Sequence, residues 1–179
     1  TAVGSNAGAA VTTGIRNTFV GGLAGDATTT ASDNTAIGKS SLGANTTGAN
    51  NTAVGESSLA SNTTASSNTA IGKDALQANT TGANNVALGS SAGAALTTGS
   101  SNILIGSNTG DALTTANENT AVGHFSMSNN VLGAKNVAIG TSTLSSTNPA
   151  SAADMYNVAV GFQAGNAVTT GVRQTLIGG

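Results

Sequence analysis

The most constraining feature of this chain is a five-residue motif, Asn-Thr-Ala-Ile-Gly, restated every seventeen residues almost from end to end. Residues 34–38 show its full form. A fixed period this short leaves room for one coil per repeat, so it predicts a solenoid in which each repeat packs only on its neighbours. The single break in spacing lies between Asn136 and Asn157, where four extra residues enter.

The asparagine is numbered here as position one of the repeat. It occurs at Asn17, Asn34, Asn51, Asn68, Asn85, Asn102, Asn119, Asn136 and Asn157, with Gln174 in the last repeat. Stacked amides can bond from coil to coil, so this column predicts a structural asparagine ladder in preference to a ligand site.

Glycine occupies position five. It occurs at Gly4, Gly21, Gly38, Gly55, Gly72, Gly89, Gly106, Gly123, Gly140, Gly161 and Gly178. Because glycine adopts positive φ freely, this column predicts a turn at the end of each motif.

Positions two to four predict a short strand. Position two is mostly threonine or β-branched, position three is mostly alanine, and position four is always Val, Ile or Leu. Positions two and four should share one face and position three the other, although the sequence does not say which face points inward. Thr-Thr pairs at positions thirteen and fourteen, such as residues 46–47, predict a second β-prone stretch. The fold class is therefore all-β: one parallel β-solenoid or β-roll domain of about ten coils over residues 1–179.

Positions nine and twelve exchange volume. Where position nine is glycine, position twelve is apolar, as in Gly93 with Leu96; where position nine is large, position twelve is polar, as in Leu59 with Asn62. Close-packed cores penalise both voids and overpacking, so the two positions should share one interior volume. Residues 25 and 28 break the rule, and we expect Leu23 to fill that space.

Opposite charges recur one period apart. Lys39, Glu56 and Lys73 follow one another at position six, and at position seventeen Arg16 precedes Asp33 and Glu118 precedes Lys135. Coils stacked in register would place these charges side by side, as cross-strand pairs.

Composition excludes several classes of function. Only 7% of residues are charged, the net charge is -2 and cysteine is absent, so we expect no nucleic-acid partner and no thiol chemistry. No apolar run approaches the ~20 residues of a membrane span. One histidine and scattered carboxylates offer no triad, no acid-base pair and no metal set, so we expect neither catalysis nor a cofactor.

Residues 119–162 hold most of the aromatic side chains and the insertion, 148–154. Aromatic groups beside a polar loop suit sugars and protein partners, so a candidate ligand patch for a surface glycan or protein receptor is His124, Phe125, Tyr156 and Phe162. The alternative is sequence drift around a tolerant loop that these side chains cover.

Residues 68–82, which read NTAIG, then AL, then NTTG, resemble the repeats of bacterial and phage tail-fibre-like proteins. The opening pentapeptide is also similar to the repeats in the heads of trimeric autotransporter adhesins, which are left-handed parallel β-rolls. The resemblance implies an extracellular, non-catalytic fibre shaft or head that is structural or adhesive and forms a homotrimer. A slim coil independently favours association, because it buries few large side chains of its own.

Two further expectations concern assembly and an alternative function. Residues 1–22 and 158–179 match at fourteen of twenty-two positions, so we expect an excerpt of a longer array or a unit that stacks end to end into a filament. The alternative function is an ice-binding solenoid that presents its threonine and asparagine columns as a regular array.

Overall fold

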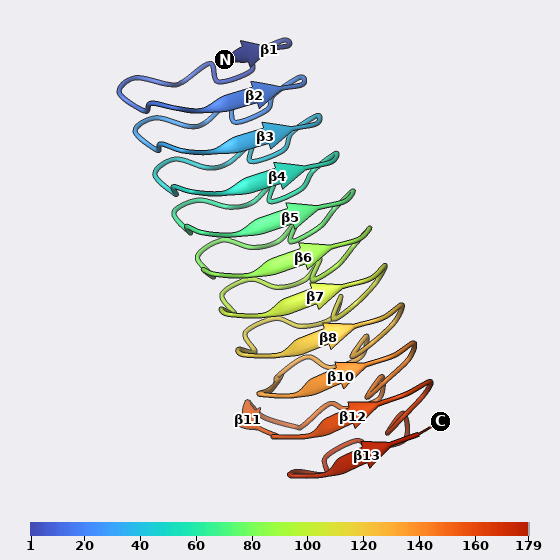
Figure 1. Ribbon diagram of the computed structural model, residues 1–179. Helices are drawn as coiled ribbons and strands as arrows, with labels where there is room; N and C mark the ends of the chain where they lie inside the picture. The colour runs from blue at the N-terminus through green and yellow to red at the C-terminus, as the bar shows by residue number, and fades with distance from the viewer. Residues whose placement is uncertain (179) are drawn as a thin grey trace.

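The computed structural model, which describes residues 1–178, is a stack of coils that runs from the N-terminus at the top of Figure 1 to the C-terminus at the bottom. Eleven parallel strands form one continuous sheet in the order β1-β2-β3-β4-β5-β6-β7-β8-β10-β12-β13. The predicted all-β parallel solenoid is therefore confirmed. No helix among these residues is long and apolar enough to cross a membrane.

Each coil contributes one short strand to this sheet. The strands are β1 (Ala2–Val3), β2 (Thr18–Val20), β3 (Thr35–Ile37), β4 (Thr52–Val54), β5 (Thr69–Ile71), β6 (Val86–Leu88), β7 (Ile103–Ile105), β8 (Thr120–Val122), β10 (Val137–Ile139), β12 (Val158–Val160) and β13 (Thr175–Ile177). A separate two-stranded sheet pairs β9 (Gly133–Ala134) with β11 (Ala153–Asp154).

The register follows the sequence period. Ala53 pairs with Ala70, one repeat later, and equivalent positions pair along the sheet. Across the insertion Val137 still pairs with Val158, so the extra residues leave the sheet intact and form the β9–β11 contact beside it.

The Thr-Thr pairs do not form the second strand that their composition predicts. In one example the backbone N–H groups of Thr46 and Thr47 and the hydroxyl of Thr46 all donate to the carbonyl oxygen of Thr63, at 2.9, 3.3 and 3.0 Å. Three donors that converge on one acceptor replace the evenly spaced bonds of a parallel ladder. The threonine hydroxyl thus links coils outside the sheet.

The core is a single apolar layer down the axis of the stack. Position three points inward and is fully or almost fully buried in β2 to β12, mostly as alanine. The position-nine side chains Leu42, Leu59, Leu76, Met127 and Leu144 are fully buried opposite it. Small alanines on the strand therefore leave room for large side chains from the far wall.

The exchange of volume between positions nine and twelve has a direct geometric cause. A Cβ atom built on Gly110, at position nine, would lie 2.8 Å from Cδ1 of Leu113, at position twelve of the same coil. The expectation for residues 25 and 28 is wrong in one respect: Leu23 is 39% exposed, and the Phe19 ring fills the space beside Gly25 instead. Phenylalanine at position three thus takes the volume that leucine fills in other coils.

The position-five glycines allow the coils to approach one another. Gly72 has φ +137, and a Cβ built on it would lie 2.4 Å from the carbonyl oxygen of Gly89 in the next coil. Both the backbone conformation and the close approach exclude any side chain at this corner.

Candidate functional site

The outward face of the eleven-stranded sheet runs along the whole stack of coils. This outer sheet face consists of positions two and four: Thr18, Val20, Thr35, Ile37, Thr52, Val54, Thr69, Ile71, Val86, Leu88, Ile103, Ile105, Thr120, Val122, Val137, Ile139, Val158, Val160, Thr175 and Ile177, with Val3 of β1. Every member is aliphatic or threonine, and none is charged.

Large aliphatic side chains are exposed along the whole length of this face. Ile37 and Ile71 are each 40% exposed and Ile139 is 41% exposed, although a position that is always Val, Ile or Leu would ordinarily be core. The most apolar section is β6 and β7, where positions two and four carry Val86, Leu88, Ile103 and Ile105. Contiguous exposed apolar surface of this kind marks interaction sites in soluble proteins.

The dimensions of the face follow from strand geometry. Strands of three residues and a spacing of about 4.8 Å between neighbours make it about 10 Å wide and about 50 Å long. Its projected area is therefore about 500 Å², within the range of the largest apolar patch on a typical monomer, which is often functional.

Two rows of side chains border the outer sheet face. The leading rim is the residue before each opening asparagine: Arg16, Asp33, Asn50, Ser67, Asn84, Ser101, Glu118, Lys135, Tyr156 and Arg173. All ten have φ between +55 and +62, which turns the chain into the strand. The trailing rim is the residue after each position-five glycine: Ser5, Gly22, Lys39, Glu56, Lys73, Ser90, Ser107, His124, Thr141 and Phe162.

The expected ion pairs between stacked coils form in part. Arg16 Nη2 lies 2.7 Å from Asp33 Oδ2, and this guanidinium holds the pKa of the Asp33 carboxyl below its usual value. Lys73 Nζ lies 3.9 Å from Glu56 Oε2. Within residues 1–178, Lys39 and Glu118 form no ion pair.

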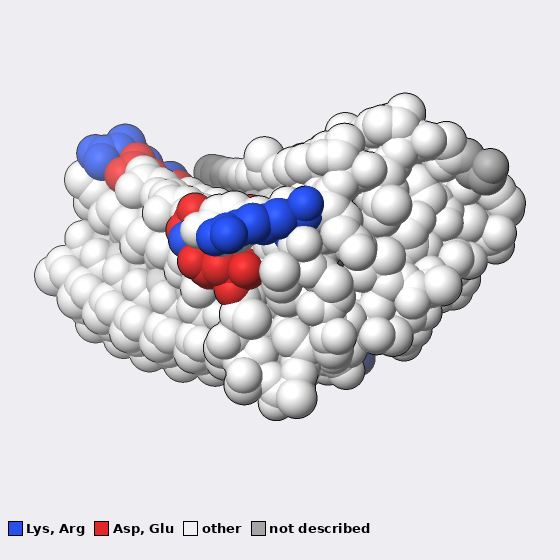
Figure 2. Space-filling view, turned by 90° about the horizontal axis from the view of Figure 1, so that it is seen from below, with Lys and Arg blue, Asp and Glu red and all other residues white. Residues whose placement is uncertain are grey.

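Lys135 pairs with the insertion instead of with Glu118. Its Nζ lies 2.7 Å from Asp154 Oδ2, and hydrogen bonds to Asp154 and Tyr156 raise the pKa of the lysine. The sequence missed this pair because an insertion breaks the period on which the prediction rested. Figure 2, which looks along the stack, shows such charges gathered into small mixed groups on a surface that is otherwise uncharged.

The structure does not bring the four candidate ligand-patch residues together. His124 and Phe125 lie in contact, with ring centroids 4.0 Å apart, and Phe162 is on the same trailing side of the sheet. Tyr156 is on the leading rim, on the other side of β12, with Lys135 Nζ 5.3 Å and Arg173 Cζ 5.9 Å from its ring centroid. Two separate exposed aromatic sites therefore replace the one expected patch.

The asparagine column lies inside the coil. From Asn34 to Asn157 each position-one asparagine is buried, at most 1% exposed. Asn68 is typical: its Oδ1 accepts from the backbone N–H of Asn85 at 2.9 Å, and its Nδ2 donates to the carbonyl oxygen of Gly82 at 2.9 Å. The column therefore binds neighbouring coils and is closed to external ligands.

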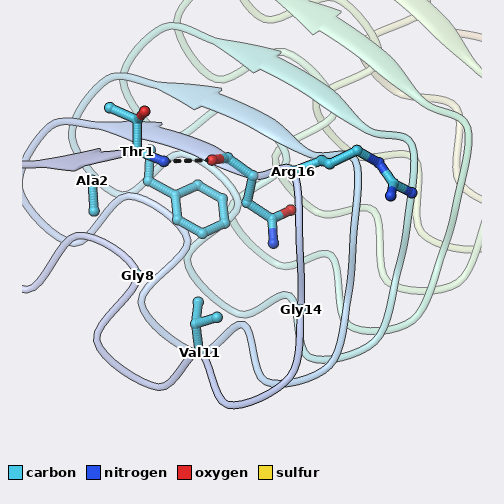
Figure 3. Close-up of a pocket in the computed structure, with 8 residues that line it drawn as sticks. Thr1, Ala2, Gly8, Val11, Gly14 and Arg16 are labelled. Atoms are coloured by element: carbon cyan, nitrogen blue, oxygen red, sulfur yellow. Dashed lines mark hydrogen bonds between the residues drawn. The ribbon is translucent and has the colours of Figure 1, made fainter.

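Two hollows of about 280 Å³ each lie at opposite ends of the stack. Gly8, Val11 and Phe19 line the first, beneath the bond from the Thr1 amine to the Asn17 carbonyl oxygen (Figure 3). These are core positions nine, twelve and three, so the hollow is the cross-section of the apolar interior. Its lining also includes Thr1, Arg16 and Asn17, and the side chain of Arg16 points away from the hollow (Figure 3).

Groups able to hold a metal ion are absent from residues 1–178: nowhere do three or more His, Asp or Glu side chains converge. The outer sheet face with its two rims is thus the candidate functional site. Comparison of the chain with models of protein families, with curated proteins and with solved structures finds no match.

Proposed function

We propose that this chain is a structural module of an extracellular fibre, which assembles with copies of itself through the outer sheet face and performs no catalysis. The observation that carries the proposal is the aliphatic row at position four, from β2 to β13, in which every Ile and Leu is exposed and every Val is half-buried. Burial of this row contributes about 25 cal/mol for each Å² of apolar surface removed from water.

The remaining features support the same role. Hydrogen bonds tie every coil to both neighbours, as a stiff rod requires: the N–H of Thr52 donates to the Asn68 carbonyl oxygen, and that of Gly55 to the Ile37 carbonyl oxygen. The resemblance to tail-fibre-like repeats and adhesin heads favours a trimer. Three copies around one axis would turn all three outer sheet faces inward. A glycan or protein receptor would then contact the sides of the coils that the assembly leaves exposed.

The test is the mass of the folded protein in solution by light scattering. We expect three times the 16.9 kDa of one chain. The double variant Leu88→Glu with Ile105→Lys should run as a single chain, because it places charges in the middle of the face. Within one chain these two side chains occupy paired positions on the neighbouring strands β6 and β7, and opposite charges there spare the monomer fold.

A matched control is Ile15→Glu, which changes a 56% exposed isoleucine outside the sheet and should leave the mass unchanged. An unmodified chain that runs at 16.9 kDa over a wide range of concentration would refute self-association.

Ice binding remains as a second candidate because of one column. Threonine at position fourteen is exposed in seven consecutive coils, at Thr13, Thr30, Thr47, Thr64, Thr81, Thr98 and Thr115. The position-one asparagines cannot be part of an ice-binding surface, because they are buried. Thermal hysteresis that Thr64→Lys abolishes would support ice binding. If the chain shows no thermal hysteresis, the ice-binding hypothesis is refuted and the fibre module remains as the proposal.

A further inference from the structure

The two rims determine how copies can meet. A stable interface buries about 800 Å² on each partner, more than the projected area of about 500 Å² that the outer sheet face supplies. The side chains that border the face must therefore contribute contact as well. The inference that follows rests on the proposed self-association and concerns its symmetry and register.

Any cyclic assembly about an axis parallel to the stack brings unlike rims together. When each copy turns its outer sheet face to the axis, the leading rim of one copy meets the trailing rim of the next. Copies at the same height place each leading-rim residue opposite the trailing-rim residue six positions later. An antiparallel pair would instead invert the heights and bring the first coils of one copy to the last coils of the other.

Side chains at equal height are complementary. Asp33 lies at the height of Lys39, and Glu118 at the height of His124, so both matched pairs join an acid to a base. Tyr156, 47% exposed, lies at the height of Phe162, 62% exposed, and these would join two aromatic rings. At every other height of residues 1–178 at least one partner is uncharged, so no like charges meet.

These side chains have little to bind within their own chain. Within residues 1–178 the side chains of Lys39, Glu118 and His124 make neither an ion pair nor a hydrogen bond. Asp33 has one partner, Arg16. The opposite rim of a second copy would give these acids and bases the partners that a single copy lacks.

A shift of one coil removes this match. If the leading rim of one copy met the trailing rim one coil later, Arg16 would face Lys39 and Asp33 would face Glu56. Two like-charge contacts would then replace the two acid-base pairs. Charge complementarity of this kind therefore excludes the one-coil shift more than it adds affinity. A two-coil shift would pair Arg16 with Glu56 and Asp33 with Lys73, and closure of the copies around one axis excludes it.

We infer that copies of this chain assemble in parallel and at equal height, with the leading rim of each against the trailing rim of its neighbour, so that Asp33 meets Lys39, Glu118 meets His124 and Tyr156 meets Phe162. The second copy is the partner that these rims fit.

Cysteine cross-linking tests the register, since the chain has no cysteine of its own. Ser101 and Ser107 border β7 at equal height on the two rims, and both can be changed to cysteine with little change in volume. Within one chain they are six residues apart across a strand, about 20 Å, too far for a disulfide. We expect the double variant to form disulfides between chains under mild oxidation, up to the full assembly, and each single variant to remain uncross-linked.

Shifted pairs supply the controls. Ser101→Cys combined with Ser90→Cys, or with His124→Cys, tests one coil before and one coil after. Disulfide geometry tolerates little displacement, so the equal-height pair should cross-link at least about tenfold faster than either. An intact assembly in which a shifted pair reacts faster, or in which Ser101→Cys reacts alone, would overturn the inference. A monomeric mass would instead refute the proposed function itself.

Discussion

Replacement of Gly72 by alanine probes the contact between coils on which the whole stack depends. Its Cβ would lie 2.4 Å from the Gly89 carbonyl oxygen, 2.5 Å from the carbonyl carbon and 3.0 Å from the Ser90 nitrogen. Ordinary contact begins at 3.4 Å, so the next coil would have to retreat by about 1 Å. All three neighbours are backbone atoms, which cannot rotate away.

That retreat disrupts the hydrogen bonds that join these coils. The N–H of Gly89 donates to the Ile71 carbonyl oxygen and that of Thr69 to the Asn85 carbonyl oxygen, each at 2.8 Å. Loss of a bond costs about 1 kcal/mol. A side chain at this φ of +137 adds about 1–3 kcal/mol of backbone strain. We expect Gly72→Ala to lower the free energy of unfolding by about 3–5 kcal/mol.

The measurement is urea denaturation followed by circular dichroism, with Gly22→Ala as the control. Gly22 is the residue next to a position-five glycine, and a Cβ built on it would have its nearest neighbour, the Ser5 carbonyl oxygen, at 4.0 Å. This control should change stability by less than about 0.5 kcal/mol. Equal stability of the two variants would refute the argument that close coil contact demands glycine.

Three further predictions test the apolar core, the asparagine ladder and the partly buried carboxyl group of Asp111. Phe19→Ala alone should cost about 3–5 kcal/mol, and Gly25→Leu added to it should recover most of this, because the pair restores the arrangement of the other coils; thermal melts would show it. Asn68→Ala should cost about 2–4 kcal/mol in urea denaturation, since it leaves the Asn85 N–H without its partner and removes one of the two donors to the Gly82 carbonyl oxygen. Burial raises the pKa of the Asp111 carboxyl, so its contribution to stability is present below the unfolded pKa and is lost as pH rises through the folded pKa. Asp111→Asn should therefore raise the melting temperature at pH 7 but not at pH 3, and an equal change at both pH values would contradict this.

The seventeen-residue period by itself predicted much of the fold. An asparagine and a glycine in fixed places predicted coils of seventeen residues, and the strands pair at that spacing. The exchange between positions nine and twelve predicted a shared interior volume, which the contact of Gly110 with Leu113 shows directly. It failed at residue 25, because the sequence could not show that the ring of Phe19, six residues earlier, crosses the coil.

The candidate site was less accessible from sequence. Position four is always aliphatic, which in most strands indicates the core, yet these side chains face outward. One signal was present: alanine at position three is too small to fill an interior alone and suits a wall faced by large side chains such as Leu76. Tyr156 was grouped with Phe162 by nearness in sequence, and the strand between them places them on opposite rims.

The sequence by itself determined the repeat, the register and the places where only glycine fits, because these follow from local backbone chemistry repeated at constant spacing. Only the tertiary structure decided which side of each strand is inside. Alternation along a strand defines two faces but does not say which of them is buried. The closure of the coil decides this, because it encloses position three against position nine and leaves positions two and four half-buried or exposed on the outside. The outer sheet face, and with it the proposed function, exists because of that closure.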